Sequence, residues 1–113
     1  MPRYLISFPD GAMKLSDEEF ELASIESHAV VEEAKRAGVW IFGGGIDSGQ
    51  VTGALAATDG TIVASDPART PPVGGFSIVD VASREEAHAW AARIAAACRC
   101  DQEVWALIPS DVA

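Results

Sequence analysis

Two residues of this 113-residue chain have the types and the setting for acid–base chemistry, His28 and Asp47. His28 lies at the edge of the apolar arc of a predicted helix, and a half-buried histidine there can gain and lose a proton near neutral pH. Asp47 follows a glycine run at the end of a predicted strand, where a carboxylate can project into a cavity and orient a histidine ring. The pattern therefore predicts a His-Asp pair.

Both residues also have plain structural explanations. His28 can be an ordinary surface histidine, because Glu32 lies one helical turn later, where the two side chains are neighbours on the helix surface. Asp-Ser-Gly, from Asp47, is ordinary turn chemistry. The pair is catalytic only if the fold brings both side chains to one cavity.

The glycine run itself, Gly43 to Gly49, resembles a phosphate-binding loop only superficially. Such a loop needs GxGxxG directly before a helix, whereas the segment after this GxGxxxG run is strand-like and lacks the lysine of a P-loop. The glycines indicate a strand end or bulge, where missing side chains leave room beside the backbone.

Other residues with reactive side chains give weaker signals. Cys98, Cys100 and a distant His88 fall short of a tetrahedral metal set, so we predict no metal, with Cys98 in the core and His88 in solvent. Asp59 is explained by an Asp-Gly hairpin. The default role of the three tryptophans is core or dimer interface.

Composition excludes several classes of partner. Seventeen acidic against eight basic residues give a net charge of −9, which repels nucleic acid and anionic membrane surfaces. Two cysteines one residue apart fit a reducing compartment. With no charged-then-apolar leader and no long apolar run, we expect a cytoplasmic protein with one domain, residues 1–113, and no cofactor.

Periodicity and turn signals predict the secondary structure. Ser16 with Glu19 and Ser83 with Glu86 form capping boxes that open the two helices. The predicted elements are a strand at Arg3–Phe8, a helix at Asp17–Ala37, a buried strand at Val39–Phe42, a hairpin across Val51–Val63, an exposed loop at Ser65–Pro72, a strand at Gly74–Val81, a helix to about Ala97 and a strand at Glu103–Ile108.

This order predicts an α+β fold of ferredoxin-like plan, with two βαβ halves forming an antiparallel sheet and both helices on one face. The other face still carries apolar side chains. Pairing sheet to sheet in a homodimer would cover them.

Three segments also resemble one known family, the YCII-related proteins that include the DGPF-domain proteins. They are HAVVEEAKRAGVWIFGGGID, GGFSIVDVASREEAHAWAARIAAA and EVWALIP, in that order along nearly the whole chain. The resemblance implies a dimeric α+β barrel of ferredoxin-like subunits. It also implies a cleft in each subunit with a helix histidine and an aspartate, which match His28 and Asp47.

The chain departs from both branches of that family. Ile25 stands where YCII-like members often have arginine, and the DGPF signature is shortened to Ser65-Asp66-Pro67. The resemblance implies a lyase, isomerase or dehydrochlorinase acting on an unidentified small molecule. The alternative is a non-catalytic ligand-binding or interaction module. The residues expected to line the pocket are Trp40, Gly44, Gly45, Asp66 and Phe76.

Overall fold

A computed structural model describes residues 2–47, 53–69 and 72–109. Its elements follow in the order β1 (Arg3–Pro9), α1 (Asp17–Arg36), β2 (Trp40–Gly45), β3 (Ala54–Ala56), β4 (Ile62–Ala64), β5 (Val73–Asp80), α2 (Arg84–Cys98) and β6 (Glu103–Ala106). The predicted α+β class and the order of elements are confirmed.

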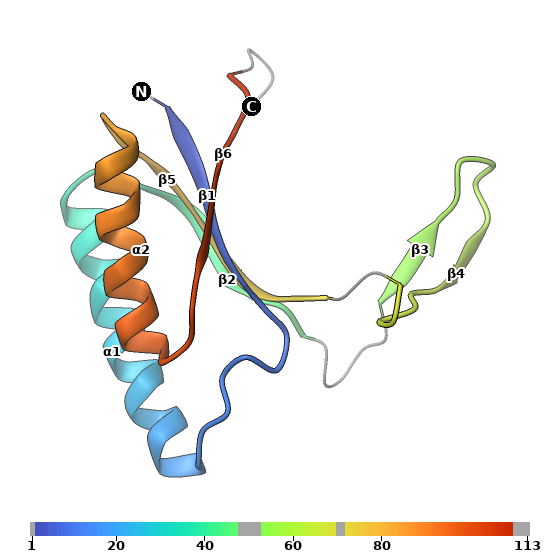
Figure 1. Ribbon diagram of the computed structural model, residues 1–113, viewed down its shortest axis with the longest axis horizontal. Coiled ribbons are helices and arrows are strands. Elements are labelled where there is room, and N and C mark those ends of the chain that lie inside the picture. Colours follow the sequence, from blue (N-terminus) through green and yellow to red (C-terminus); the bar gives the residue numbers. More distant parts are fainter. Residues whose placement is uncertain (1, 48–52, 70–71, 110–113) are drawn as a thin grey trace.

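Four strands form the main sheet, in the order β2-β5-β1-β6, and each neighbouring pair is antiparallel. Each helix therefore connects two strands that are separated by a third. Both helices lie on the same face of the sheet, as predicted (Figure 1). The strands β3 and β4 form a separate two-stranded ribbon that projects away from the opposite face (Figure 1).

The core lies between the helices and the sheet. Tyr4 and Ile6 on β1 and Val79 on β5 point toward the helices, and Ile6 is completely buried. The rest of the buried cluster is small and aliphatic: Ala34, Val39, Val81, Ala87, Ala91, Ile94 and Cys98. Alanines on both helices let the helix backbones approach the sheet and each other closely.

The helix ends follow the predicted signals. Ser16 caps α1 by accepting from the Glu19 N–H at 3.2 Å, and the Glu19 side chain accepts from the Ser16 N–H at 3.3 Å. Gly38 follows the helix with φ of +76°, which favours glycine. Ser83 caps α2 by accepting from the Glu86 N–H at 3.2 Å, which is one half of the predicted capping box. The described contacts include no bond from the Ser83 N–H back to the Glu86 side chain, so the full box is confirmed for α1 alone.

The apolar arc of α1 predicts a core face made of Phe20, Ala23, Val30, Val31, Ala34 and Ala37, and this prediction is wrong at the two ends of the helix. Ala23 and Ala34 are buried, but Phe20 is 52% exposed and Ala37 is exposed as well. The first turns of α1 extend beyond the end of α2, so that no second helix covers Phe20 (Figure 1). The prediction of a buried strand is also wrong for Phe42, which is 63% exposed, because β2 is an edge strand.

The hairpin is confirmed, with a longer loop than the two-residue turn that Asp59-Gly60 predicts. Ala57 N–H donates to the Thr61 carbonyl at 2.8 Å, which leaves a three-residue loop, 58–60. Gly60 has φ of +91°, as such a loop requires at its last position. Residues 51 and 52, which the prediction included, lie outside the described residues.

The sheet face away from the helices, called the open face below, carries apolar side chains. Strand pairing puts Leu5 opposite Trp105 and Ile78 on this face, and Ile78 opposite Phe42. Phe42 and Trp105 are 63% and 62% exposed, so the described part of the subunit does not cover them fully. Neither helix of the described structure is long and apolar enough to cross a membrane.

Candidate functional site

The predicted base, His28, lies midway along α1 and is exposed, so the prediction that it is half-buried is wrong. Its Nδ1 atom is 2.6 Å from the carbonyl oxygen of Ser24, one turn earlier, and 3.5 Å from the Ser24 hydroxyl. A carbonyl oxygen only accepts hydrogen bonds, so Nδ1 carries the proton. In the neutral ring, Nε2 then holds the lone pair, and it is the atom available to accept a proton.

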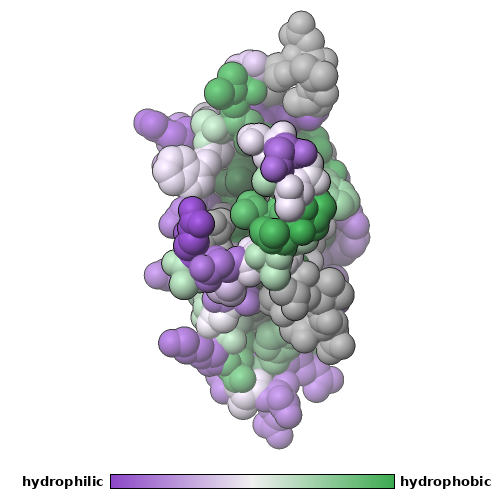
Figure 2. All heavy atoms as spheres, turned by 90° about the vertical axis from the view of Figure 1, so that its right-hand side faces the viewer, coloured by the Kyte–Doolittle hydropathy of each residue, from purple (hydrophilic) through white to green (hydrophobic). Residues whose placement is uncertain are grey.

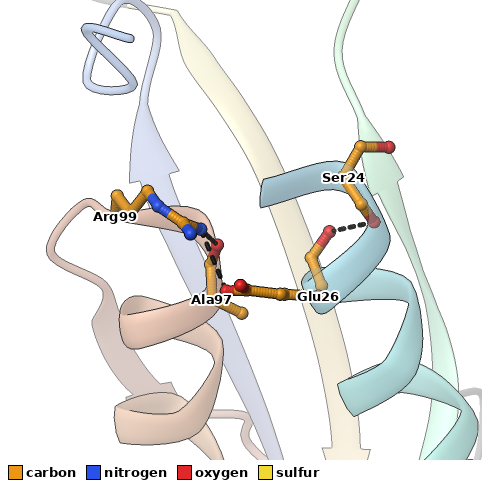
Figure 3. A network of polar contacts seen from close by, with 5 residues as sticks. Ser24, Glu26, Ala97 and Arg99 are labelled. Carbon is orange, nitrogen blue, oxygen red and sulfur yellow. Dashed lines mark hydrogen bonds and ion pairs between the residues drawn. The ribbon is translucent and has the colours of Figure 1, made fainter. Parts of the chain in front are cut away.

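The Ser24 carbonyl has a second donor, the Ser27 hydroxyl at 3.1 Å. Figure 3 shows Ser24 on α1, with a dashed line for the hydrogen bond from the Ser27 hydroxyl to the Ser24 carbonyl oxygen. Both bonds are local to α1 and require no partner from elsewhere in the chain. The orientation of the His28 ring is therefore fixed by its own helix.

Asp47 lies two residues beyond β2 on an exposed stretch of chain. The preceding residue is anchored, because Ile46 N–H donates to the Gly74 carbonyl at 2.9 Å. Within residues 2–47, 53–69 and 72–109, no hydrogen bond or ion pair joins His28 to Asp47. Their pairing stays a prediction.

The predicted pocket-lining residues lie on both faces of the sheet. Trp40 is opposite Val79, on the helix-covered face, whereas Gly44 is opposite Phe76 on the open face. Gly45 pairs with Gly75. Asp66 is exposed in the loop after β4, where its carboxylate accepts from the Ala68 N–H at 3.0 Å. Of this set, Gly44 and Phe76 are brought together.

The glycines of β2 serve the two faces differently. A Cβ on Gly43 would lie 2.5 Å from the Phe76 carbonyl oxygen and 2.8 Å from the Trp40 ring, so the ring occupies the space of the missing side chain. A Cβ on Gly44 would meet no described atom within 4 Å. Gly43 is required by packing, and Gly44 leaves space on the open face.

That space borders an aromatic pair. The Phe42 and Phe76 rings lie 6.0 Å apart between centroids at 49°, within the range of favourable aromatic contacts. Gly44 lies directly opposite Phe76 and two residues after Phe42, so bare backbone lies beside both rings on the open face.

A hollow of about 340 Å³ lies between α2 and β6. It is lined by His88, Ala91, Ala92, Ala95, Asp101, Gln102 and Val104. The prediction for His88 recognised its exposure but missed this hollow. The sequence does contain a signal for it, because His88, Ala92 and Ala95 share one face of the helix by their spacing. The short alanine side chains beside the histidine leave an empty volume at the helix surface.

The charged network between the helices is structural. The Arg99 guanidinium donates to the Ala97 carbonyl at 2.6 Å and lies 3.1 Å from the Glu26 carboxylate, joining the end of α2 to α1 (Figure 3). Arg93 bonds Glu33 across the same interface. The hydrogen bond from Arg93 holds the pKa of Glu33 below its usual value.

The two cysteines are free thiols, Cys98 buried and Cys100 half-buried. Burial raises the pKa of both thiols, which makes them poor nucleophiles at neutral pH. Among the described residues, no group of three or more His, Cys, Asp or Glu side chains is placed to hold a metal ion.

Comparisons with known proteins add no family. No protein-family model matches this chain, and no curated protein matches it either. The resemblance to YCII-related proteins therefore stays a prediction from three sequence segments.

Proposed function

We propose that this chain is a homodimer of ferredoxin-like subunits, paired through their open faces into a dimeric α+β barrel, and that it catalyses acid–base chemistry on a small molecule. The strand order β2-β5-β1-β6 supports the subunit fold, because each helix connects strands split by a third. The apolar, exposed open face supports the pairing.

The observation that carries the catalytic role is the hydrogen bond from His28 Nδ1 to the Ser24 carbonyl. It fixes the tautomer and leaves Nε2 as the basic atom of an exposed ring. A histidine oriented in this way by a backbone carbonyl is prepared to accept a proton without first reorienting.

In the proposed reaction, Nε2 removes a proton from carbon next to a carbonyl or enol, and the electron pair stays on the substrate. An isomerase returns that proton to another atom of the same molecule. A lyase instead expels a leaving group with its bonding electrons. Asp47 stabilises the imidazolium that forms, and neither step needs an oxidant, metal or cofactor.

The test is His28→Gln, with His88→Gln on the other helix as the matched control. Because the His28 ring is exposed, we expect unchanged unfolding free energy and a loss of about 10²-fold or more in turnover on cyclic enol and lactone substrates. The control should retain its activity. An active His28→Gln enzyme would remove the catalytic role.

The link to Asp47 has a separate measurement. If the two residues act together, the loss of turnover in the double variant His28→Gln with Asp47→Asn is smaller than the product of the two single losses. Losses that simply multiply would mean that His28 acts without Asp47.

A second candidate is a non-catalytic ligand-binding module. The observation that favours it is the split of the predicted lining residues, with Trp40 on the helix-covered face and Phe76 on the open face. Under this proposal, the ligand binds at Phe42, Gly44 and Phe76. The test is a ligand that raises the melting temperature without being converted. An equal rise for the wild type and for His28→Gln would favour the ligand-binding module over the enzyme.

We also propose that the protein works in the cytoplasm, whose reducing conditions suit its two free thiols.

A further inference from the structure

The hairpin β3–β4 is an apolar ribbon whose side chains are exposed to solvent. All six of its strand residues are apolar and exposed. Leu55 pairs with Val63 on one side of the ribbon, and Ile62 pairs with Ala56 on the other. Leu55, Ile62 and Val63 are 53%, 64% and 49% exposed, so both sides of the ribbon face solvent.

Within residues 2–47, 53–69 and 72–109, the rest of the subunit leaves these side chains exposed. The hairpin projects from the open side of the sheet, away from both helices (Figure 1). Seen from that side, hydrophobic side chains gather on the part of the molecule nearest the viewer (Figure 2). An isolated two-stranded hairpin is marginally stable in water, and this one carries the aliphatic side chains of a core element.

The turn, in contrast, is well defined. Asp59 accepts from the Thr61 N–H at 2.9 Å, and Ser65 N–H donates to the Gly53 carbonyl at 2.8 Å at the base of the ribbon. These hydrogen bonds fix the conformation of the hairpin, while its aliphatic side chains stay exposed.

The size of the open face indicates what that surface is. Four strands of seven, six, eight and four residues, about 4.8 Å apart and about 3.3 Å per residue, give a flat area of roughly 400 Å². A specific protein interface of standard size buries about 800 Å² on each partner. A dimer paired through the open faces therefore needs further contact area, and the hairpin extends from the same side of the sheet.

Charge also suits a second copy. The chain carries a net charge of −9, so two copies repel each other except where charges are sparse. Between Ala54 and Ala64 the only charged residue is Asp59, at the tip. The strands of the ribbon carry no charge, and the middle of the open face carries Leu5, Ile78 and Trp105. On the same face Arg3 pairs with Asp80 and Glu103 lies opposite Ser7, so two acidic chains can meet at the ribbon and at the middle of the sheet.

We propose that β3–β4 is a dimerisation arm, whose Leu55–Val63 side packs against the second copy of this chain when the open faces pair. This inference rests on the homodimer of the proposed function and adds a second contact region to it. In a two-fold dimer, each subunit gives one arm and receives one.

The first experiment measures dimer dissociation by sedimentation equilibrium. The arm variant is Leu55→Gln with Val63→Thr, the control is Thr58→Gln at the exposed tip, and Phe42→Gln tests the open face. We expect a dimeric wild type, a tenfold or greater rise in the dissociation constant for the arm and open-face variants, and no change for the control. Circular dichroism checks that each variant folds.

The outcomes separate the two proposals. If Phe42→Gln dissociates and the arm variant does not, the arm is overturned and the homodimer stands. A wild type that is monomeric at 100 µM, on the order of the weakest specific dimers, overturns both.

A second experiment identifies what covers the arm. A photoreactive amino acid at position 55 is activated in a mixture of ¹⁴N- and ¹⁵N-labelled protein, and the cross-linked peptides are analysed by mass spectrometry. Mixed-isotope cross-links support contact with the second copy. Cross-links within one chain only, or none in a dimeric sample, overturn the proposal.

Discussion

Replacing Gly43 by alanine tests how the glycine run of β2 is used. The new Cβ would lie 2.5 Å from the Phe76 carbonyl oxygen and 3.0 Å from the Ser77 Cα. Both atoms belong to the backbone of β5, which pairs with β2 on one side and β1 on the other and cannot move aside easily. The Trp40 ring, 2.8 Å away, would also have to shift.

The magnitude follows from two opposing effects. Overpacking of this kind costs about 1–3 kcal/mol. Replacing glycine by alanine returns about 0.4–1 kcal/mol, because the unfolded chain loses entropy. We therefore expect Gly43→Ala to lower the free energy of unfolding by about 1–2 kcal/mol, roughly 4–8 °C in melting temperature for a chain of this size.

The neighbouring Gly44 is the matched control. A Cβ there would meet no described atom within 4 Å, and its φ does not lie in the left-handed region. Gly44→Ala should therefore be neutral or stabilising by about 0.4–1 kcal/mol. Urea unfolding at two protein concentrations separates folding from association. If the two variants are equally stable, the packing argument for Gly43 is wrong.

Four further predictions concern the fold. Ser16→Ala removes the N-cap of α1 and should cost about 1 kcal/mol in urea unfolding, with Lys14→Ala, outside the cap, as a neutral control. Ile6→Ala empties a fully buried position and should cost about 2–5 kcal/mol by the same assay. Iodoacetamide should label half-buried Cys100 before buried Cys98, and labelling in the reverse order would contradict the burial of Cys98. Because burial raises the pKa of Cys98, its contribution to stability is present below about pH 9 and falls as pH rises through the folded-state pKa, which urea unfolding across that range measures.

The helices were predictable because their signals are local. Ser16 with Glu19, Ser83 with Glu86, and Gly38 act within one turn, and each ends or begins a helix where the sequence predicts it. Burial at the ends of elements was not predictable in the same way. Phe20 shares the apolar arc of α1, yet its exposure depends on where α2 ends in space.

The candidate site shows a second limit. Strict alternation along β2 puts Trp40, Phe42 and Gly44 on one face. The register shifts between Trp40 and Phe42, so that Trp40 lies opposite Val79 and Phe42 opposite Ile78. One irregular residue thus moves Trp40 to the helix-covered face. Sequence periodicity cannot locate such a bulge, and the predicted pocket combined residues from both faces for this reason.

Ordinary strand alternation puts Gly43 and Gly44 on opposite faces, and the bulge brings the Trp40 ring to the face of Gly43. Gly43 faces the helices, where the Trp40 ring fills the place of its side chain. Gly44 faces the open side beside Phe76, where no described atom within 4 Å of a Cβ makes glycine necessary. A bare backbone in a strand is useful where another backbone or a ligand approaches closely. Among the described residues nothing requires glycine at position 44, and the effect of Gly44→Ala on association or ligand binding, with folding unchanged, measures whether a partner or ligand requires it.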